Sequence, residues 1–391
     1  MRRSPVEILA VFLRLGCLSF GGPVAHLAYF REEFVARRRW LDDGTFGECV
    51  ALTQLLPGPG SSQTGMLIGW LAGGPLGAVA AWIGFTTPSA IAMATIAVAL
   101  PHGSTTTGWL HGLLLVATAV VASALVTMRA ALAPDWRRML IALAVFALVL
   151  LAPGPVIAPV GIGAAALAGF VALHGRVKTD DPKLDLKISR RAGAAVLLLF
   201  IAALLAAALI ARATQAPAAI LFDTLFRVGS LVFGGGHVVL PLLQSQVASA
   251  GIVDQGTILA GYAAAQAMPG PLFTISSYVG RAAYDGTLGA AGALIGTLAI
   301  FSPSFFLLPG VAPFYRALAS NDRFRSALAG ANAGVVGLLG AAFVTPIWTT
   351  AVHTVVDGVA VFIAFLALYV CRVPPWVVVL AGAGVGTYLA R

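Results

Sequence analysis

Two Pro-Gly-Pro segments break otherwise apolar stretches, and hydroxyl or amide side chains follow each break. The first reads LLPGPGSSQ over residues 55–63, and the second reads AMPGPLFTISS over residues 267–277. Two prolines around a glycine stop an α-helix, because each removes a backbone hydrogen bond and clashes with the preceding turn. A helix that restarts after such a break exposes unpaired N–H groups and roughly half a positive charge. These segments therefore predict binding of an anion.

The residues that we expect to bind this anion fall into three groups. They lie at the two breaks, at the glycine-rich ends of two other helices, or at two intramembrane arginines. They are Arg14, Gly21, Gly22, Pro57, Gly58, Pro59, Ser61, Ser62, Gln63, Arg227, Gly234, Gly235, Pro269, Gly270, Pro271 and Thr274. Arg14 and Arg227 interrupt apolar segments, where a charge costs several kcal/mol unless it meets an anion or a carboxylate. They are candidate paired cations for a dianion, and snorkelling to the membrane surface is the alternative.

Four further residues are candidates for proton coupling or gating, namely Glu48, His237, Gln54 and Gln266. A structural hydrogen bond is the alternative for His237, and pairing with a basic neighbour is the alternative for Glu48. The three cysteines are far apart and form no metal-binding spacing, so we expect neither a metal nor a cofactor.

The composition indicates a helical membrane protein. Of the 391 residues, 59% are hydrophobic and 10% are charged, whereas soluble domains carry roughly 25% charged residues. Apolar stretches such as 76–100, 109–128, 192–211 and 355–371 are each about long enough to cross a ~30 Å hydrocarbon core. They lack the alternation of a membrane β-barrel.

The chain contains two similar halves. FLRLGCLSFGGP at 12–23 resembles LFRVGSLVFGGG at 225–236, and QLLPGP at 54–59 resembles QAMPGP at 266–271. We therefore predict a first repeat over 1–175, a cytoplasmic loop with a linker transmembrane helix over 176–213, and a second repeat over 214–391.

The basic residues predict opposite orientations for the two repeats. If the N-terminus is cytoplasmic, 18 of the 24 Lys and Arg residues lie on cytoplasmic segments, and the opposite loops, such as 101–108 and 345–354, contain none. Matching loops then face opposite sides. The expected fold is an all-α polytopic membrane protein with two inverted-topology repeats, joined by the 192–211 helix as in secondary transporters. Loop 176–191 resembles a plain cytoplasmic connection.

Each Pro-Gly-Pro segment should form the tip of a re-entrant hairpin. Segments 44–56 and 61–72 are too short to span the membrane, and the same holds for 255–268 and 272–283. Broken backbone inside a membrane is tolerated where protein or a water-filled cavity surrounds it. The two hairpins should enter from opposite sides so that their tips meet.

Several of these motifs together resemble the chromate transporter family in its long, two-domain form. They are SFGGP at 19–23, RRRWL at 37–41, LLPGP at 55–59, VFGGGHVVLPLL at 232–243 and AAQAMPGPLF at 264–273. The resemblance implies a bacterial inner-membrane protein with antiparallel halves and about thirteen crossings, which exports chromate using chemiosmotic energy. Many long members carry an acidic residue and glutamines after LLPGP, and this chain has Gly60-Ser61-Ser62-Gln63 there.

We therefore expect a secondary transporter that exports chromate, driven by the membrane potential, with proton exchange as an open addition. A sulfate or other oxyanion importer of the same fold is one alternative, and an anion channel is another. An enzyme is not expected, because the chain has no HExxH, GxSxG or P-loop motif. The basic residues follow one membrane face, so we expect no nucleic-acid partner. A homodimer is left open.

Overall fold

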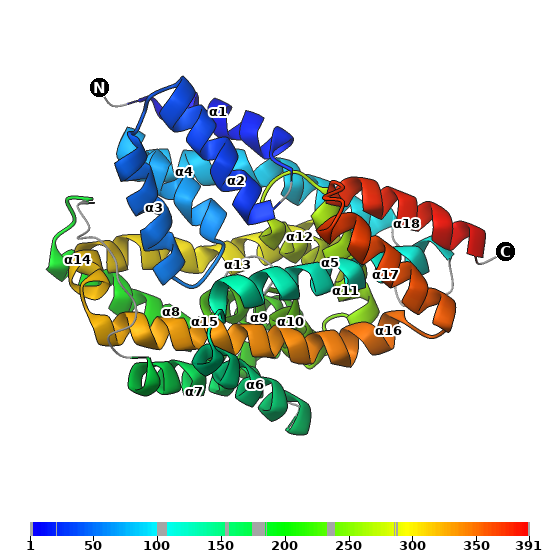
Figure 1. Ribbon diagram of the computed structural model, residues 1–391. Coiled ribbons are helices and arrows are strands. Elements are labelled where there is room, and N and C mark those ends of the chain that lie inside the picture. The colour runs from blue at the N-terminus through cyan, green and yellow to red at the C-terminus, as the bar shows by residue number, and fades with distance from the viewer. Residues whose placement is uncertain are drawn as a thin grey trace. The chain divides into compact units, whose positions relative to one another are not determined.

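The computed structural model describes residues 3–20, 22–99, 108–152, 156–173, 184, 186–232, 239–284, 286 and 288–389. Every regular element in these ranges is a helix, which confirms the all-α class (Figure 1). Five of the described helices are long and apolar enough to cross a membrane, and several shorter apolar helices accompany them. The chain is therefore a helical polytopic membrane protein.

The described residues of the first part of the chain form seven α-helices and one π-helical turn before the linker helix. They are α1 (Pro5–Leu18), α2 (Gly22–Arg31), η1 (Glu32–Arg37), α3 (Asp43–Leu55), α4 (Gly60–Ala99), α5 (Gly108–Leu132), α6 (Trp136–Leu151) and α7 (Ile157–Ala172). The linker helix expected over 192–211 is α8 (Arg190–Thr214). Almost none of α8 is buried although its mean hydropathy is 3.0, as a lipid-facing helix requires.

The second part of the chain repeats this pattern with shorter pieces. Its elements are α9 (Pro217–Leu231), α10 (Val239–Leu243), η3 (Gln244–Ala248), α11 (Gln255–Ala267), η4 (Leu272–Thr274), α12 (Ile275–Ala282), α13 (Leu288–Val311), η5 (Ala312–Phe314), α14 (Tyr315–Ala319), α15 (Asp322–Ala342), η6 (Phe343–Trp348), α16 (Thr349–Ala351), α17 (Val355–Tyr369) and α18 (Pro375–Leu389).

The helices gather into two compact units, each of which takes segments from both halves of the sequence. Unit 1 comprises Met1–Ala94, Thr179–Gly236 and Pro269–Asn321. Unit 2 comprises Thr95–Lys178, His237–Met268 and Asp322–Arg391. The units therefore do not follow the sequence division at 175 and 214, which stays a prediction about the repeats.

Unit 1 has an aromatic core beneath its N-terminal helices. Phe12 of α1 stacks on Phe34 of η1 with ring centroids 4.9 Å apart, and Phe30 of α2 meets Phe85 of α4 edge-on at 5.0 Å. All four rings are buried. In the same unit, α8, α9 and α12 pack against α13. This packing fixes the ends of α1 and α9, where the glycine-rich motifs begin.

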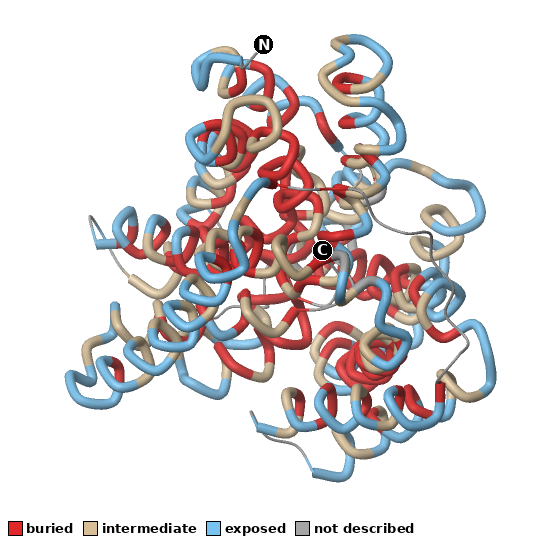
Figure 2. The backbone as a smooth tube through the Cα atoms, turned by 90° about the vertical axis from the view of Figure 1, so that its left-hand side faces the viewer, coloured by how far each residue is buried: buried red, intermediate tan, exposed pale blue. Residues whose placement is uncertain are grey.

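Unit 2 is built around two central helices. Helix α15 packs along α6 and α7, and α5 packs against α11, α17 and α18 (Figure 1). Close approach depends on glycine: a Cβ at Gly169 of α7 would lie 2.6 Å from the Cα of Gly330 of α15. Small residues at helix contacts are typical of membrane bundles, which have no hydrophobic driving force between helices. Figure 2 shows the result as helices with one buried and one exposed face.

The linker before α8 is not the plain connection that the sequence suggested. Leu184 and Leu186 are buried in a cluster with Cys49 and Leu52 of α3 and Tyr315 of α14. The backbone N–H of Leu184 also donates a hydrogen bond to the carboxylate of Glu48. Ile188 packs against the same cluster, so three apolar side chains attach this segment to unit 1.

Gly280 of α12 and Gly292 of α13 provide a test of the close packing in unit 1. A Cβ at Gly280 would lie 2.0 Å from the carbonyl oxygen of Gly292, and one at Gly292 would lie 2.1 Å from that of Gly280. Gly292→Ala should lower the thermal unfolding midpoint of the detergent-solubilised protein, because overpacking costs about 1–3 kcal/mol. Gly163→Ala in α7 is the control, since no atom lies within 4 Å of a Cβ there. Equal midpoints for both variants would contradict this packing.

Candidate functional site

The first Pro-Gly-Pro segment forms a helix break between two half-helices. The carboxylate of Asp42 caps α3 by accepting a 2.7 Å hydrogen bond from the N–H of Thr45, and α3 ends at Leu55. Helix α4 restarts at Gly60, and a non-helical Gly74 (φ 72°) divides its first arm from its long second part. The expected segments 44–56 and 61–72 are thus confirmed as half-helices. The hydroxyls of Thr53 and Thr64, 2.9 Å apart, join the two arms.

The second Pro-Gly-Pro segment breaks the chain in the same way. Helix α11 begins with Asp254, whose carboxylate accepts a 2.9 Å hydrogen bond from the N–H of Thr257, and it ends at Ala267. After the break, the 3-10 turn η4 leads into α12. The sequence analysis missed the caps, although Asp-x-Gly-Thr recurs at 42–45 and 254–257. That repeat is the signal that would have located both half-helix starts.

The glycine of each break is hydrogen-bonded to the first helix of the other half, and all four residues belong to unit 1. The N–H of Gly58 donates to the carbonyl of Val232 (2.7 Å), just after α9. The N–H of Gly270 donates to the carbonyl of Ser19 (2.9 Å), just after α1. Ser19 and Val232 occupy equivalent positions in the two FGG motifs. Among the described residues, these bonds run from each break to an FGG motif rather than between the tips.

The hydroxyls of two serines, Ser89 and Ser304, lie close to these glycines. A Cβ on Gly58 would lie 2.6 Å from Nε2 of Gln63 and 3.4 Å from the hydroxyl of Ser304, and one on Gly270 would lie 2.7 Å from the hydroxyl of Ser89. Gly58 and Gly270 have φ values of 119° and 93°, which disfavour any side chain. Ser89 and Ser304 each follow a proline within a long helix, and this repeated Pro-Ser pair went unnoticed in the sequence analysis.

His26 of α2 is a buried bridging residue that sequence reasoning missed. Its Nε2 lies 3.1 Å from the carbonyl oxygen of Ser19, and its Nδ1 lies 3.2 Å from the hydroxyl of Ser61. A carbonyl oxygen only accepts hydrogen bonds, so Nε2 carries the donated proton. His26 therefore ties the end of α1 to the start of α4, through the same carbonyl that holds Gly270. Val239 stands at the matching position of the second half, so repeat comparison gave no signal.

Both breaks are followed by buried polar side chains with unused hydrogen-bonding capacity. Ser61, Ser62, Gln63 and Thr274 are all buried. The hydroxyls of Ser62 and Ser276 and the side-chain oxygen of Gln63 have no hydrogen-bond partner in the described part of the chain. A buried polar group without a partner costs about 1–3 kcal/mol. The Ser62 and Ser276 hydroxyls can donate to a bound oxyanion, whereas the side-chain oxygen of Gln63 can only accept a hydrogen bond.

Other polar atoms at the breaks are already paired. The Nε2 of Gln63 donates to the carbonyl of Pro57 (2.7 Å) and to the hydroxyl of Ser304 (3.2 Å), and the Thr274 hydroxyl donates to the carbonyl of Pro271 (2.8 Å). Pro59 and Pro271 are buried, and Pro57 and Pro269 are half-buried. These bonds shape the tips, and among the serines that follow the breaks they leave the hydroxyls of Ser62 and Ser276 as donors.

The two arginines of the expected site occupy different environments. Both side chains are exposed, but Arg227 of α9 also forms a 2.8 Å ion pair with the buried carboxylate of Asp223, one turn earlier on the same helix. The sequence analysis missed this carboxylate, although the spacing of Asp223 and Arg227 in FDTLFR is that of a helical ion pair. Asp223 matches Ala10 in the first half, so the two arginines are not chemically equivalent.

The candidates for proton coupling and gating do not lie together. Glu48 accepts the Leu184 N–H, Gln54 is exposed, and Gln266 hydrogen-bonds Tyr262 on α11. Gly22 begins α2 with φ 75° and open space where a Cβ would be. Gly21, Gly234, Gly235 and His237 lie outside the described residues.

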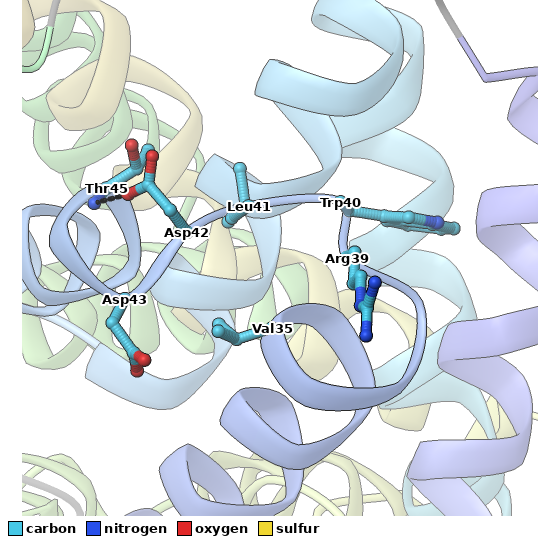
Figure 3. Close-up of a pocket in the computed structure, with 7 residues that line it drawn as sticks. All are labelled: Val35, Arg39, Trp40, Leu41, Asp42, Asp43 and Thr45. Atoms are coloured by element: carbon cyan, nitrogen blue, oxygen red, sulfur yellow. Dashed lines mark hydrogen bonds between the residues drawn. The ribbon is translucent and has the colours of Figure 1, made fainter.

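A separate hollow of about 580 Å³ lies beside the entrance to α3 and is lined by Val35, Arg39, Trp40, Leu41, Asp42, Asp43 and Thr45 (Figure 3). The hydrogen bond from the Thr45 N–H lowers the pKa of Asp42, so this carboxylate is ionised at neutral pH. Asp43 pairs with Arg31 at 2.7 Å. Because carboxylates line this hollow, it does not suit a dianion as a binding site.

Comparison with known proteins supports a transporter. The sequence model of the family described as "Chromate transporter" matches residues 6–170 and 219–387. A chromate transport protein of Pseudomonas aeruginosa is 29% identical over 92% of this chain and 86% of its own length. An uncharacterized transporter of Methanocaldococcus jannaschii is 28% identical, covering 94% and 90%, and a probable chromate transport protein of Synechococcus elongatus is 26% identical, covering 86% and 83%.

No solved structure matches this chain. The two matched ranges fit the two inverted repeats, and together they cover nearly all of the sequence outside the linker. With its paired FGG and Pro-Gly-Pro motifs held in one unit, this chain belongs to the chromate transporter family.

Proposed function

We propose that this protein exports chromate from the cell and binds it at the two helix breaks of unit 1. The observation that carries the proposal is the pair of reciprocal bonds from Gly58 to Val232 and from Gly270 to Ser19. These bonds fix two helix starts, and each start is followed by a buried hydroxyl without a hydrogen-bond partner among the described residues. The relatives in Pseudomonas and Synechococcus are described as a chromate transport protein and a probable chromate transport protein, which supports the same substrate.

The donors at the breaks suit a tetrahedral dianion. Helix N-termini provide N–H groups and a partial positive charge. They can therefore bind an anion without forming an ion pair between the anion and a charged side chain. Neutral donors favour a transporter, because the substrate must leave as readily as it enters. Arg14 and Arg227 remain proposed contributors to the field around the site, with Arg227 already balanced by Asp223.

The membrane potential sets the direction of the proposed transport. A cell interior held negative by 100 mV favours the exit of one negative charge by about 2.3 kcal/mol, hence about 4.6 kcal/mol for a dianion. Export from the cytoplasm across the bacterial inner membrane, with the N-terminus inside, therefore needs no other energy source. Proton exchange through Glu48 or His237 would add to this gradient.

The direct experiment measures chromate uptake into inverted membrane vesicles, since uptake there corresponds to export from the cell. An interior-positive potential should drive saturable chromate uptake, and sulfate should compete because it has the same shape and charge. Absence of chromate uptake at every potential would contradict chromate export. Transport of sulfate alone, in the direction that corresponds to import into the cell, would contradict it as well. Flux that never saturates would indicate a channel.

Alanine at the glycine of either break should abolish this transport. In Gly58→Ala and Gly270→Ala the new methyl group meets side-chain atoms within 3 Å, and the positive φ adds strain of about 1–3 kcal/mol. Gly47→Ala in α3 is the matched control, because no atom lies within 4 Å of a Cβ there. Initial uptake rates in vesicles, normalised to folded protein, provide the comparison. Wild-type rates in both break variants would refute the proposed role of the breaks.

The role of Arg227 can be separated from its ion pair. Arg227→Gln leaves the buried carboxylate of Asp223 without its partner and should lower the unfolding midpoint. The double variant Asp223→Asn with Arg227→Gln should recover stability, because the paired charges are removed together. If Arg227 also attracts substrate, the Michaelis constant for chromate should stay raised in the double variant. A wild-type Michaelis constant would assign Arg227 to structure alone.

A further inference from the structure

His111, His353 and Asp357 form a cluster in unit 2 that chromate transport does not use. One potential ligand atom from each of the three residues lies within 4.8 Å of the other two. His111 belongs to α5, His353 precedes α17, and Asp357 lies in the first turn of α17. We infer that this cluster binds a divalent transition-metal ion of the zinc class. Sequence spacing gave no hint, because His111 and Asp357 are 246 residues apart.

The side chains already converge. The Nε2 of His111 lies 2.7 Å from Oδ1 of Asp357, and the rings of His111 and His353 lie nearly parallel, 19° apart, with centroids at 5.8 Å. Two imidazoles and one carboxylate are a common protein ligand set for zinc, with water in the fourth position.

The carboxylate is held in place by its surroundings. Its Oδ2 accepts hydrogen bonds from the N–H of His353 (3.0 Å) and of Thr354 (2.8 Å), and the Thr354 hydroxyl accepts the N–H of Asp357 in a capping box. Asp357 is 5% exposed. Such outer contacts orient a metal ligand. They occupy Oδ2 and leave Oδ1 directed at His111, so the site is partly preorganised.

A small movement would complete the site. Nitrogen and oxygen ligands lie about 2.0–2.2 Å from zinc, which places them about 3–4 Å from each other. His353 is exposed, so its ring can approach by the remaining ångström or so, while the Nε2 of His111 and Oδ1 of Asp357, 2.7 Å apart, would separate slightly as both bind the ion. Imidazole suits Zn²⁺, Co²⁺, Ni²⁺ and Cu²⁺, whereas Mg²⁺ and Ca²⁺ prefer oxygen ligands. On the orientation proposed above, the cluster faces the outside of the cell, where it meets metal ions directly.

A metal-free brace is the competing explanation for the same geometry. In such a brace, the hydrogen bond between His111 and Asp357 connects α5 to α17, and the His353 ring only stacks on that of His111. The two explanations differ in what they expect of His353. A metal site requires its ring as a ligand, whereas a brace does not.

The test uses the full chain in detergent, purified without a polyhistidine tag and stripped with chelator. Titration with Co²⁺ should produce the visible absorption of a bound ion, and Zn²⁺ should displace it and raise the unfolding midpoint. His353→Ala should weaken Co²⁺ binding by at least about tenfold, as loss of a ligand or its support does. His174→Ala, which removes a different histidine, is the matched control and should bind as the wild type does.

Two further results decide between the explanations. His111→Ala and Asp357→Asn should also lose the cobalt absorption, and the zinc-dependent rise in the midpoint should disappear with it. Wild-type protein without cobalt absorption would overturn the inference, and so would a His353→Ala variant that binds cobalt like the wild type. In both of those cases the cluster is a brace. Chromate transport is not part of this test, so its result is independent of the proposed function.

Discussion

The hydrogen bonds from Gly58 to the carbonyl of Val232 and from Gly270 to that of Ser19 are the constraint on which the site depends. Each one joins a Pro-Gly-Pro break of one repeat to the end of the first helix of the other. A break in a membrane helix leaves backbone groups that lipid cannot satisfy, and here the opposite repeat satisfies one of them. The two repeats therefore interlock in unit 1, where each break is hydrogen-bonded to the other repeat. This explains why the compact units cut across the sequence halves.

Each break is followed by a buried serine hydroxyl, that of Ser62 or of Ser276, which has no hydrogen-bond partner among the described residues. The imidazole of His26 donates a second hydrogen bond to the Ser19 carbonyl and positions the Ser61 hydroxyl. The proposed chromate site thus consists mainly of neutral donors, and helix ends would give it its positive character. The charges on Arg14 and Arg227 lie outside this group of donors, on an exposed face and in an ion pair.

Much of the fold was predictable from the sequence, because its signals are local. Prolines and glycines located both breaks, apolar length located α8, and the duplicated motifs located the repeats. The partners of the breaks were not predictable, since a bond such as Gly58 to Val232 depends on how the repeats interlock and leaves no trace in spacing. His26 and Asp223 were missed because only one repeat carries each of them, whereas the Asp-x-Gly-Thr caps were readable and overlooked. The packing of Leu184 and Leu186 was not predicted either, because charged residues dominate that segment of the sequence.

Equilibrium binding of chromate to the purified protein and to its Ser62→Ala and Ser276→Ala variants tests the central claim most directly. Neither hydroxyl has a partner in the described chain, so removing it should leave the unfolding midpoint unchanged or slightly raised. A hydrogen bond to a charged group contributes about 1.5–3 kcal/mol, so each variant should bind chromate about tenfold more weakly or worse. Wild-type affinity in both stable variants would contradict the account, because the dianion would then bind away from the two helix breaks.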